Sequence, residues 1–259
     1  MRTFDDYQHS YQCIALERDD GILNVRLHSG GRSLLWNDKI HWELVDLFYN
    51  ITHDPENKVV ILGGTGDSFC AGPDPDSFHF DASVPPVGLD HIYREGKALL
   101  ENLINIRCPI IGAANGLVHA HPELILLSDI VIASETASFR DPHLEYGIVP
   151  GDGIHIAFPL VFGMNRGRYL ALTSEAVSAR QALDWGAVAE VVPSEKLLPR
   201  AWELARKLSA KPVLSLRYSR EALTREIARQ IHAHLGHGLA LEGLASGFGA
   251  WGTSLHDTK

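Results

Sequence analysis

The 259-residue chain has few cysteines, no long apolar run and no signal-peptide profile at its N-terminus. Cys13, Cys70 and Cys108 are odd in number and widely spaced, without a CxxC pair, which is unlike a disulfide framework or a cysteine-based zinc site. No apolar stretch approaches the roughly 20 residues of a transmembrane helix. We therefore expect reduced thiols in a cytoplasmic protein.

Concentrated positive charge is also lacking. The formal net charge is −9, and lysine and arginine are scattered along the chain without a cluster, so we expect neither a nucleic-acid partner nor an anionic membrane surface. Hydrophobic residues make up 45% of the chain and charged residues 21%, as in an ordinary globular protein. Fourteen histidines are many for this length and are the compositional feature that suggests chemistry.

The first two thirds of the chain alternate between strand and helix patterns. Two β-rich runs on either side of Asp19-Asp20-Gly21 predict a hairpin. Apolar runs typical of buried parallel strands are separated by helical patterns, which predicts right-handed crossovers and a parallel sheet. The predicted strands are 58–64, 109–115, 129–134, 137–139 and 187–192, and the predicted helices begin near 37, 89 and 122. The segments 30–36 and 65–78 are predicted as loops.

After Gly153 the pattern becomes mainly helical. We predict helices at about 154–163, 166–173, 178–184, 194–209 and 212–246. No linker interrupts the chain, so we expect one continuous domain with a core over 1–195 and a helical section over 196–259 that packs on a neighbouring subunit.

Candidate chemistry is concentrated in 115–153, where three histidines and several carboxylates lie among apolar runs and glycine-proline turns. His143 and Asp152 are nine residues apart across such a turn. A carboxylate on one imidazole nitrogen would fix the tautomer and leave the other nitrogen to take a proton from water. No GxSxG motif is present, so water is the expected nucleophile. The alternative is a loop histidine in a surface salt bridge.

His121 also has more than one interpretation. It could stabilise an enolate, it could be an ordinary buried histidine, or it could bind a metal together with His119, since an HxH pair in an extended segment shares one face. No third ligand is evident in the sequence, so we expect no metal.

Several motifs in collinear order resemble the crotonase (enoyl-CoA hydratase/isomerase) superfamily over roughly residues 10–250. They are SFCAGPD, PIIGAANG, PEL, SDIVIAS, ASF and GIVPGDG. The resemblance implies an α/β fold with a crotonase-like ββα spiral core and a helical C-terminal section. It also implies two backbone N–H groups that form an oxyanion hole for a CoA-thioester enolate, and trimers that often pair into hexamers.

The sequence departs from the superfamily pattern at the site. The usual glycine-rich turn is replaced by His119-Ala120-His121-Pro122, and proline has no N–H to donate. The imidazole of His121 is the obvious replacement. The position of a hydratase glutamate holds His143, and the later turn introduces Asp152. The other family glutamate survives as Glu123, which we expect to point into its helix without a catalytic role.

These departures resemble the β-diketone hydrolase branch, typified by 6-oxocamphor hydrolase. The matching positions are His41, His121, His143, Asp152 and Glu242. The resemblance implies retro-Claisen C–C cleavage of cyclic 1,3-diketones without CoA or metal. His143 and Asp152 would activate water, His121 would hold the enolate, and Glu242 would assist.

Ordinary structural roles are the alternatives at the remaining positions. Glu242 could be an exposed helical glutamate, and His41 could be a half-buried structural residue or a substrate contact. Trp36, Phe78 and Phe80 are candidates for an apolar pocket wall, although aromatic residues near loops are more often core. Two other functions remain open: a CoA-thioester hydratase or isomerase that uses Glu123, and a non-catalytic crotonase-fold protein.

Overall fold

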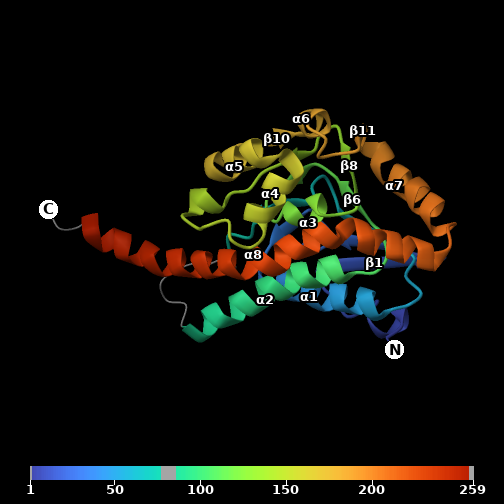
Figure 1. Cartoon of the computed structure of the whole chain (residues 1–259), viewed down its shortest axis with the longest axis horizontal. Helices are drawn as coiled ribbons and strands as arrows, with labels where there is room; N and C mark the ends of the chain where they lie inside the picture. The colour runs from blue at the N-terminus through green and yellow to red at the C-terminus, as the bar shows by residue number, and fades with distance from the viewer. Residues whose placement is uncertain (1, 77–85, 257–259) are drawn as a thin grey trace.

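The computed structural model describes residues 2–76 and 86–256, except for the side chains of 86–89 and 246–256 (Figure 1). The predicted pocket residues Phe78 and Phe80 therefore lie outside the described residues.

The larger sheet contains the strands that the apolar runs predict. Its order is β1-β2-β4-β6-β8-β11, with β1 antiparallel to β2 and the other neighbours parallel. The hairpin turns at Asp20 and Gly21, which both have positive φ angles, as its tight geometry requires. The strands are β1 (Ile14–Asp19), β2 (Ile22–Leu27), β4 (Val59–Gly64), β6 (Ile110–Ala114), β8 (Ile130–Ser134) and β11 (Glu190–Val192).

A second sheet has the order β10-β9-β7-β5-β3. Its strands are β3 (Leu34–Trp36), β5 (Cys70–Pro73), β7 (Leu117–Val118), β9 (Ser138–Phe139) and β10 (Val177–Ser178). The sequence predicted only β9, and the prediction of loops over 30–36 and 65–78 was wrong where β3 and β5 form. Strands of two to four residues are too short to show a period in the sequence.

The two sheets and the helices are built by a repeating strand-strand-helix unit. Each early strand of the larger sheet is followed by a strand of the smaller sheet and then by a helix: β2-β3-α1, β4-β5-α2 and β6-β7-α3. The predicted ββα spiral core with a helical C-terminal section is thereby confirmed. The α-helices are α1 (Asp38–His53), α2 (Pro86–Asn105), α3 (Glu123–Leu126), α4 (Ile154–Phe162), α5 (Met164–Thr173), α6 (Ala179–Asp184), α7 (Ser194–Ser209) and α8 (Val213–His256).

Helix α1 shows how the local sequence fixes an element that carries site residues. Asn37 caps it, because its side-chain oxygen accepts a hydrogen bond from the backbone N–H of Ile40 at 3.1 Å. Ile40, Leu44 and Leu47 form a buried stripe at helical spacing. His41 follows directly on that stripe and is half-buried.

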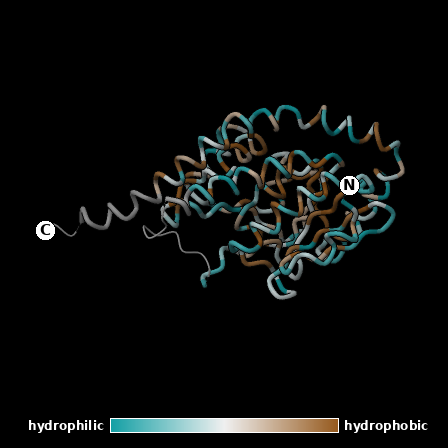
Figure 2. The backbone as a smooth tube through the Cα atoms, turned by 90° about the horizontal axis from the view of Figure 1, so that it is seen from below, coloured by the Kyte–Doolittle hydropathy of each residue, from teal (hydrophilic) through white to brown (hydrophobic). Residues whose placement is uncertain are grey.

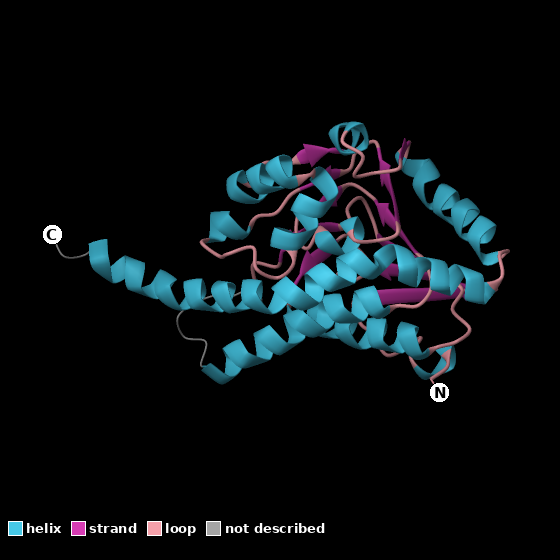
Figure 3. Ribbon diagram, viewed as in Figure 1, coloured by secondary structure: helices cyan, strands magenta, loops and turns pink. Residues whose placement is uncertain are grey.

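The helices pack in two separate apolar clusters. Leu197, Ala201 and Ala205 place one face of α7 against the larger sheet, where Ile61 and Ile111 belong to the same cluster. The larger cluster includes residues from α1, α2, α4 and α8, and Figure 3 shows the strands in the interior with the helices outside.

Helix α8 packs on α2, and its C-terminal end projects from the rest of the chain (Figures 1 and 2). It continues to His256, ten residues beyond the predicted end. The proposed division at residue 195 and the packing of 196–259 on another subunit stay predictions.

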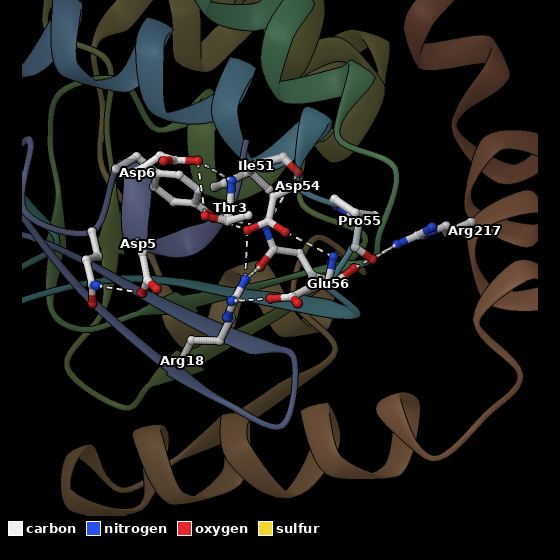
Figure 4. A network of polar contacts seen from close by, with 12 residues as sticks. Thr3, Asp5, Asp6, Arg18, Ile51, Asp54, Pro55, Glu56 and Arg217 are labelled. Carbon is white, nitrogen blue, oxygen red and sulfur yellow. Dashed lines mark hydrogen bonds and ion pairs between the residues drawn. The ribbon is translucent and has the colours of Figure 1, made fainter. Parts of the chain in front are cut away.

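A polar network anchors the beginning of α8 (Figure 4). Arg18 of β1 forms ion pairs with Asp54 at 2.7 Å and Glu56 at 2.5 Å. Tyr7 donates its hydroxyl to the same Asp54 carboxylate at 2.9 Å. Arg217 of α8 donates to the carbonyl oxygen of Pro55 at 2.6 Å. These contacts tie the hairpin, the end of α1 and α8 together.

Over the part of the chain that the structure describes, no helix combines the length and apolarity needed to cross a bilayer.

Candidate active site

Two histidines are each backed by a buried carboxylate. His121 Nδ1 lies 2.7 Å from Glu123 Oε1, and His143 Nδ1 lies 2.5 Å from Asp141 Oδ1. The side chains of Glu123 and Asp141 are fully buried. A carboxylate that accepts Nδ1–H fixes the orientation of an imidazole and favours its protonated form. The expectation that Glu123 points into its helix was wrong, because its carboxylate contacts His121, while its lack of a catalytic role stays a prediction. No prediction was made for Asp141 from the sequence.

Asp152 lies between the two imidazoles. Its Oδ2 is 3.4 Å from His121 Nδ1 and 3.3 Å from His143 Nε2. Its Oδ1 is buried without a hydrogen-bond partner among the described residues. The structure thus brings His143 and Asp152 together, but one predicted detail was wrong: Asp141 holds the orienting position at Nδ1, and Asp152 faces the nitrogen that was expected to face water.

His121 has a backbone conformation that is uncommon for a side chain of its size. Its φ is 48°, in the left-handed region, and Pro122 follows it and begins the turn into α3. Such a conformation costs of the order of 1–3 kcal/mol and persists where its surroundings hold it. Trp36 stacks on the imidazole with ring centroids 3.6 Å apart and an interplanar angle of 29°. This stack and the Glu123 contact fix the ring.

The turn that carries Asp152 depends on two glycines. A Cβ at Gly151 would lie 2.1 Å from the carbonyl oxygen of Gly238 in α8, and a Cβ at Gly153, where φ is 137°, would lie 2.4 Å from Leu100. Only glycine allows this close approach. The turn therefore packs directly on α8, and α4 begins immediately after it, beside α8 in Figure 1.

Glu242 reaches the site from α8, about one turn beyond Gly238. It is only 5% exposed, so the alternative of an exposed helical glutamate is wrong. One imidazole nitrogen of His143 and one carboxylate oxygen each of Asp152 and Glu242 lie within 4.8 Å of one another.

The charged groups of the site shift one another's pKa values. Burial alone would lower the pKa of His143, but Asp152 and Asp141 outweigh it and raise that pKa well above its usual value. Burial would likewise lower the pKa of His121, but the charges of Glu123 and Asp152 outweigh burial and raise that pKa. Burial would raise the pKa of Asp152, yet His143 and His121 hold it below its usual range. The site therefore favours two imidazolium ions around an ionised Asp152.

Glu242 is shifted in the opposite direction. Burial and the neighbouring charge of Asp152 raise its pKa to about 8, with His143 opposing them. At neutral pH the group is a carboxylic acid that can donate a proton or a hydrogen bond.

This shift predicts a pH-dependent difference in stability between the wild type and Glu242→Gln. Below pH 5 both side chains are neutral in the folded protein. At pH values between the unfolded pKa of about 4.3 and the folded pKa, Glu242 is ionised in the unfolded chain but not in the folded protein. This difference lowers the free energy of unfolding of the wild type. We expect the free energy of unfolding of Glu242→Gln, minus that of the wild type, to increase by about 4 kcal/mol between pH 5 and pH 9, because each unit between the unfolded pKa and the folded pKa of about 8 contributes about 1.4 kcal/mol. Denaturant titrations at both pH values measure it, and a pH-independent difference contradicts it.

The remaining predicted residues border this cluster. Trp36 is buried against His121, and His41 lies edge-on to both rings, with centroid distances of 5.9 Å to Trp36 and 6.3 Å to His121. His41 Nδ1 is 3.5 Å from Glu95 Oε2 of α2. Glu95 gave no signal in the sequence, because it resembles any other glutamate on a helix.

The structure also bears on metal binding by His119 and His121. His119 Nε2 lies 3.1 Å from the hydroxyl of Ser138, and His119 is absent from both clusters of potential ligands among the described residues. Those clusters are His121 with Glu123 and Asp152, and His143 with Asp152 and Glu242. The His119/His121 pair therefore forms no ligand set among the described residues, and the sequence did not reveal the two clusters that include carboxylates. Each cluster also forms the His–carboxylate contacts described above.

Comparison with known proteins identifies the family. The enoyl-CoA hydratase/isomerase family model matches residues 17–240. The chain belongs to this family. The predicted membership of the crotonase superfamily is thus confirmed.

Proteins with different activities resemble the chain. A solved β-diketone hydrolase from Anabaena sp. PCC 7120, bound to (S)-3-oxocyclohexyl acetic acid, is 46% identical, with a TM-score of 0.90, and the match covers 93% of this chain and 97% of that one. An enoyl-CoA hydratase/isomerase from Mycobacterium paratuberculosis is 25% identical, with a TM-score of 0.86 over 92% of this chain and 96% of that one. The curated 1,2-epoxyphenylacetyl-CoA isomerase of Escherichia coli (strain K12) is 31% identical over 208 residues, 79% of each chain.

The two segments that supply N–H groups in the enoyl-CoA hydratase/isomerase family lie side by side in this chain. The backbone N–H of His119 donates to the carbonyl oxygen of Cys70 at 2.9 Å, which joins the SFCAGPD segment to the second one. Where the family has glycines, this member has His121 in a left-handed conformation followed by Pro122.

Proposed function

We propose that the protein is a hydrolase that cleaves a C–C bond of cyclic 1,3-diketones by a retro-Claisen reaction and releases keto acids. The observation that carries the proposal is the pair of carboxylate-backed histidines around Asp152, in the place of a glycine-rich oxyanion turn. The 46% identity to the Anabaena β-diketone hydrolase supports it.

His121 is the electrophile in this proposal. Its Nδ1 is occupied by Glu123 and Asp152, so Nε2–H remains for a substrate oxygen. The raised pKa of His121 favours the imidazolium form, which donates to an enolate more strongly than a neutral imidazole does. A preformed donor to a developing oxyanion contributes roughly 2.7–4 kcal/mol in acyl chemistry.

Water attacks the second carbonyl carbon with help from His143 and Asp152. The water oxygen bonds to that carbon, and its proton passes to the unprotonated fraction of the His143–Asp152 pair. The tetrahedral adduct then collapses, and the bond to the central ring carbon breaks with its electron pair on that carbon. The resulting enolate is held by His121 and protonated at carbon, which yields a keto acid.

Glu242 and the aromatic residues complete the proposed site. Neutral Glu242 lies beside Asp152 and His143 and can return the proton to carbon. Trp36 and His41 would contact the substrate ring. The predicted contributions of Phe78 and Phe80 are retained as part of this proposal.

Assembly and location follow from the same proposal. We infer a homotrimer or a dimer of trimers in the cytoplasm, with section 196–259 completing the subunit contacts and with neither nucleic acid nor membrane as a partner. Light scattering of the purified protein measures the assembly.

The competing function is action on a CoA thioester, which the 31% identity to 1,2-epoxyphenylacetyl-CoA isomerase favours. It would need Glu123 free to act on substrate, whereas Glu123 is fully buried against His121. It would also need an N–H in place of the one that Pro122 lacks.

Mass spectrometry tests the proposal. The purified protein is incubated with bicyclic and monocyclic 1,3-diketones in H₂¹⁸O, without CoA and with EDTA. We expect a product heavier than the substrate by one labelled water. No product across the panel, together with turnover or strong thermal stabilisation by CoA thioesters, would replace the proposal with the competing function. Activity that EDTA abolishes would assign the two ligand clusters to a metal.

A further inference from the structure

A buried glutamate links the site to an exposed histidine. Glu95 of α2 is 9% exposed, and its Oε2 lies 3.5 Å from His41 Nδ1. Its Oε1 forms an ion pair with Nε2 of His91, one helical turn earlier. The His91 side chain is 53% exposed and lies against the ring of Trp42, with centroids 4.6 Å apart.

The other end of this line reaches the candidate site. The His41 ring lies 6.3 Å from the His121 ring and 5.9 Å from that of Trp36, edge-on to both. His41, Glu95 and His91 therefore form a line of ion-pair contacts from the site to the surface, and each carries a group that can accept and donate a proton. Neither His41 Nδ1 nor Glu95 Oε1 has a partner with hydrogen-bond geometry among the described residues, so each proton transfer requires a rotation of the ring or the carboxylate.

The proposed reaction releases a proton that such a line can carry. Hydrolysis gives a carboxylic acid whose ordinary pKa is about 4, so at neutral pH each turnover releases one proton. His121, Asp152 and Glu242 are each 8% exposed or less, so bulk water has little access to them. We propose that His41, Glu95 and His91 carry this proton from the site to solvent, an inference that rests on the proposed function.

The transfer balances without another reactant. The product acid forms beside His143 and passes its proton by way of Asp152 and His121 to His41, and His41 passes a proton to the Glu95 carboxylate. Glu95 passes a proton to His91, which releases it to water or buffer. A merely positioning role for Glu95 would instead fix the His41 ring and leave His91 without influence on turnover.

Kinetics of His91→Ala and Glu95→Gln distinguish these roles. In weakly buffered solution we expect His91→Ala to lower kcat by about tenfold with little change in KM, since an outer acid–base group contributes less than the roughly 10²–10⁴-fold of a central one. Added imidazole should restore kcat in His91→Ala but not in Glu95→Gln. His53→Ala and Glu101→Gln are matched controls: His53 is exposed on α1 and contacts the Tyr49 carbonyl, and Glu101 pairs with Lys97 on α2.

If His91→Ala has the same kcat as the wild type in weak buffer, the relay is overturned. A loss of kcat that added imidazole does not restore also overturns it. A second measurement does not depend on activity. The ¹⁵N signals of the His41 imidazole should shift in Glu95→Gln and in His91→Ala, but not in the two controls. If the wild type hydrolyses no diketone, the proposed function fails, and His41 signals that do not respond overturn the relay on their own.

Discussion

Replacing His143 with alanine is expected to lower kcat/KM by about 10³-fold, within the range for a positioned general base. Nε2 is the nitrogen that faces Asp152, and no other imidazole contacts Asp141 among the described residues. The substitution also leaves Asp141 buried without its imidazole partner, which costs about 3 kcal/mol of folding stability. His143→Asn keeps an N–H near Asp141 and removes Nε2, so it should lose the same activity with a smaller loss of stability.

The control for this prediction is His119→Asn, because His119 contacts Ser138 and belongs to neither histidine–carboxylate cluster among the described residues. The wild-type pH profile adds a second readout. A general base acts unprotonated, and the raised pKa of His143 places the rising limb of kcat/KM above the ordinary imidazole value of about 6.5. Near-wild-type turnover by His143→Asn would remove His143 from water activation.

Asp152→Asn should lower kcat by about 10²–10³-fold, because one neutral amide cannot serve two imidazolium partners. Removing the charge of Asp152 takes away one carboxylate that raises the pKa of each histidine, so both values fall. The rising limb of the pH profile should then move to lower pH. Steady-state kinetics over pH 5–9 measure both effects.

The folding stability of this variant provides the check on structure. The lowered pKa of Asp152 stabilises the native state above its unfolded value of about 3.9, and the benefit is lost as pH falls toward the folded value. The difference in unfolding free energy between wild type and Asp152→Asn should therefore shrink in acid. Asp184→Asn is the control, because the Asp184 side chain of α6 is exposed and pairs with Arg180. Wild-type kcat in Asp152→Asn would exclude the shared-carboxylate mechanism.

The sequence predicted the larger sheet and most helices because their periodicity extends over many residues. The stripe of Ile40, Leu44 and Leu47 places α1, and the apolar run 58–64 places β4. The smaller sheet was mostly missed, because strands such as Leu117–Val118 form by pairing with segments far away in the chain.

The sequence predicted most residues of the candidate site but not the contacts between them. Family resemblance pointed to His121, His143, Asp152 and Glu242, and the fold brings them together. Asp141 and Glu95 were missed, and Glu123 was misinterpreted, because a carboxylate's role depends on the direction of its side chain. No spacing in the sequence reveals that Glu123 turns back to the imidazole two residues earlier.

The conformation of His121 bears on how the activities of this family could have diverged. Changing His121 to glycine would relieve a φ of 48°, yet it would strip Glu123 of its partner and Trp36 of its stacked ring. Pro122 would still offer no N–H. A single substitution thus yields neither an imidazole donor nor a rebuilt backbone donor. An evolutionary or engineered path between diketone and CoA-thioester chemistry must change both positions together, or pass through a protein that performs neither.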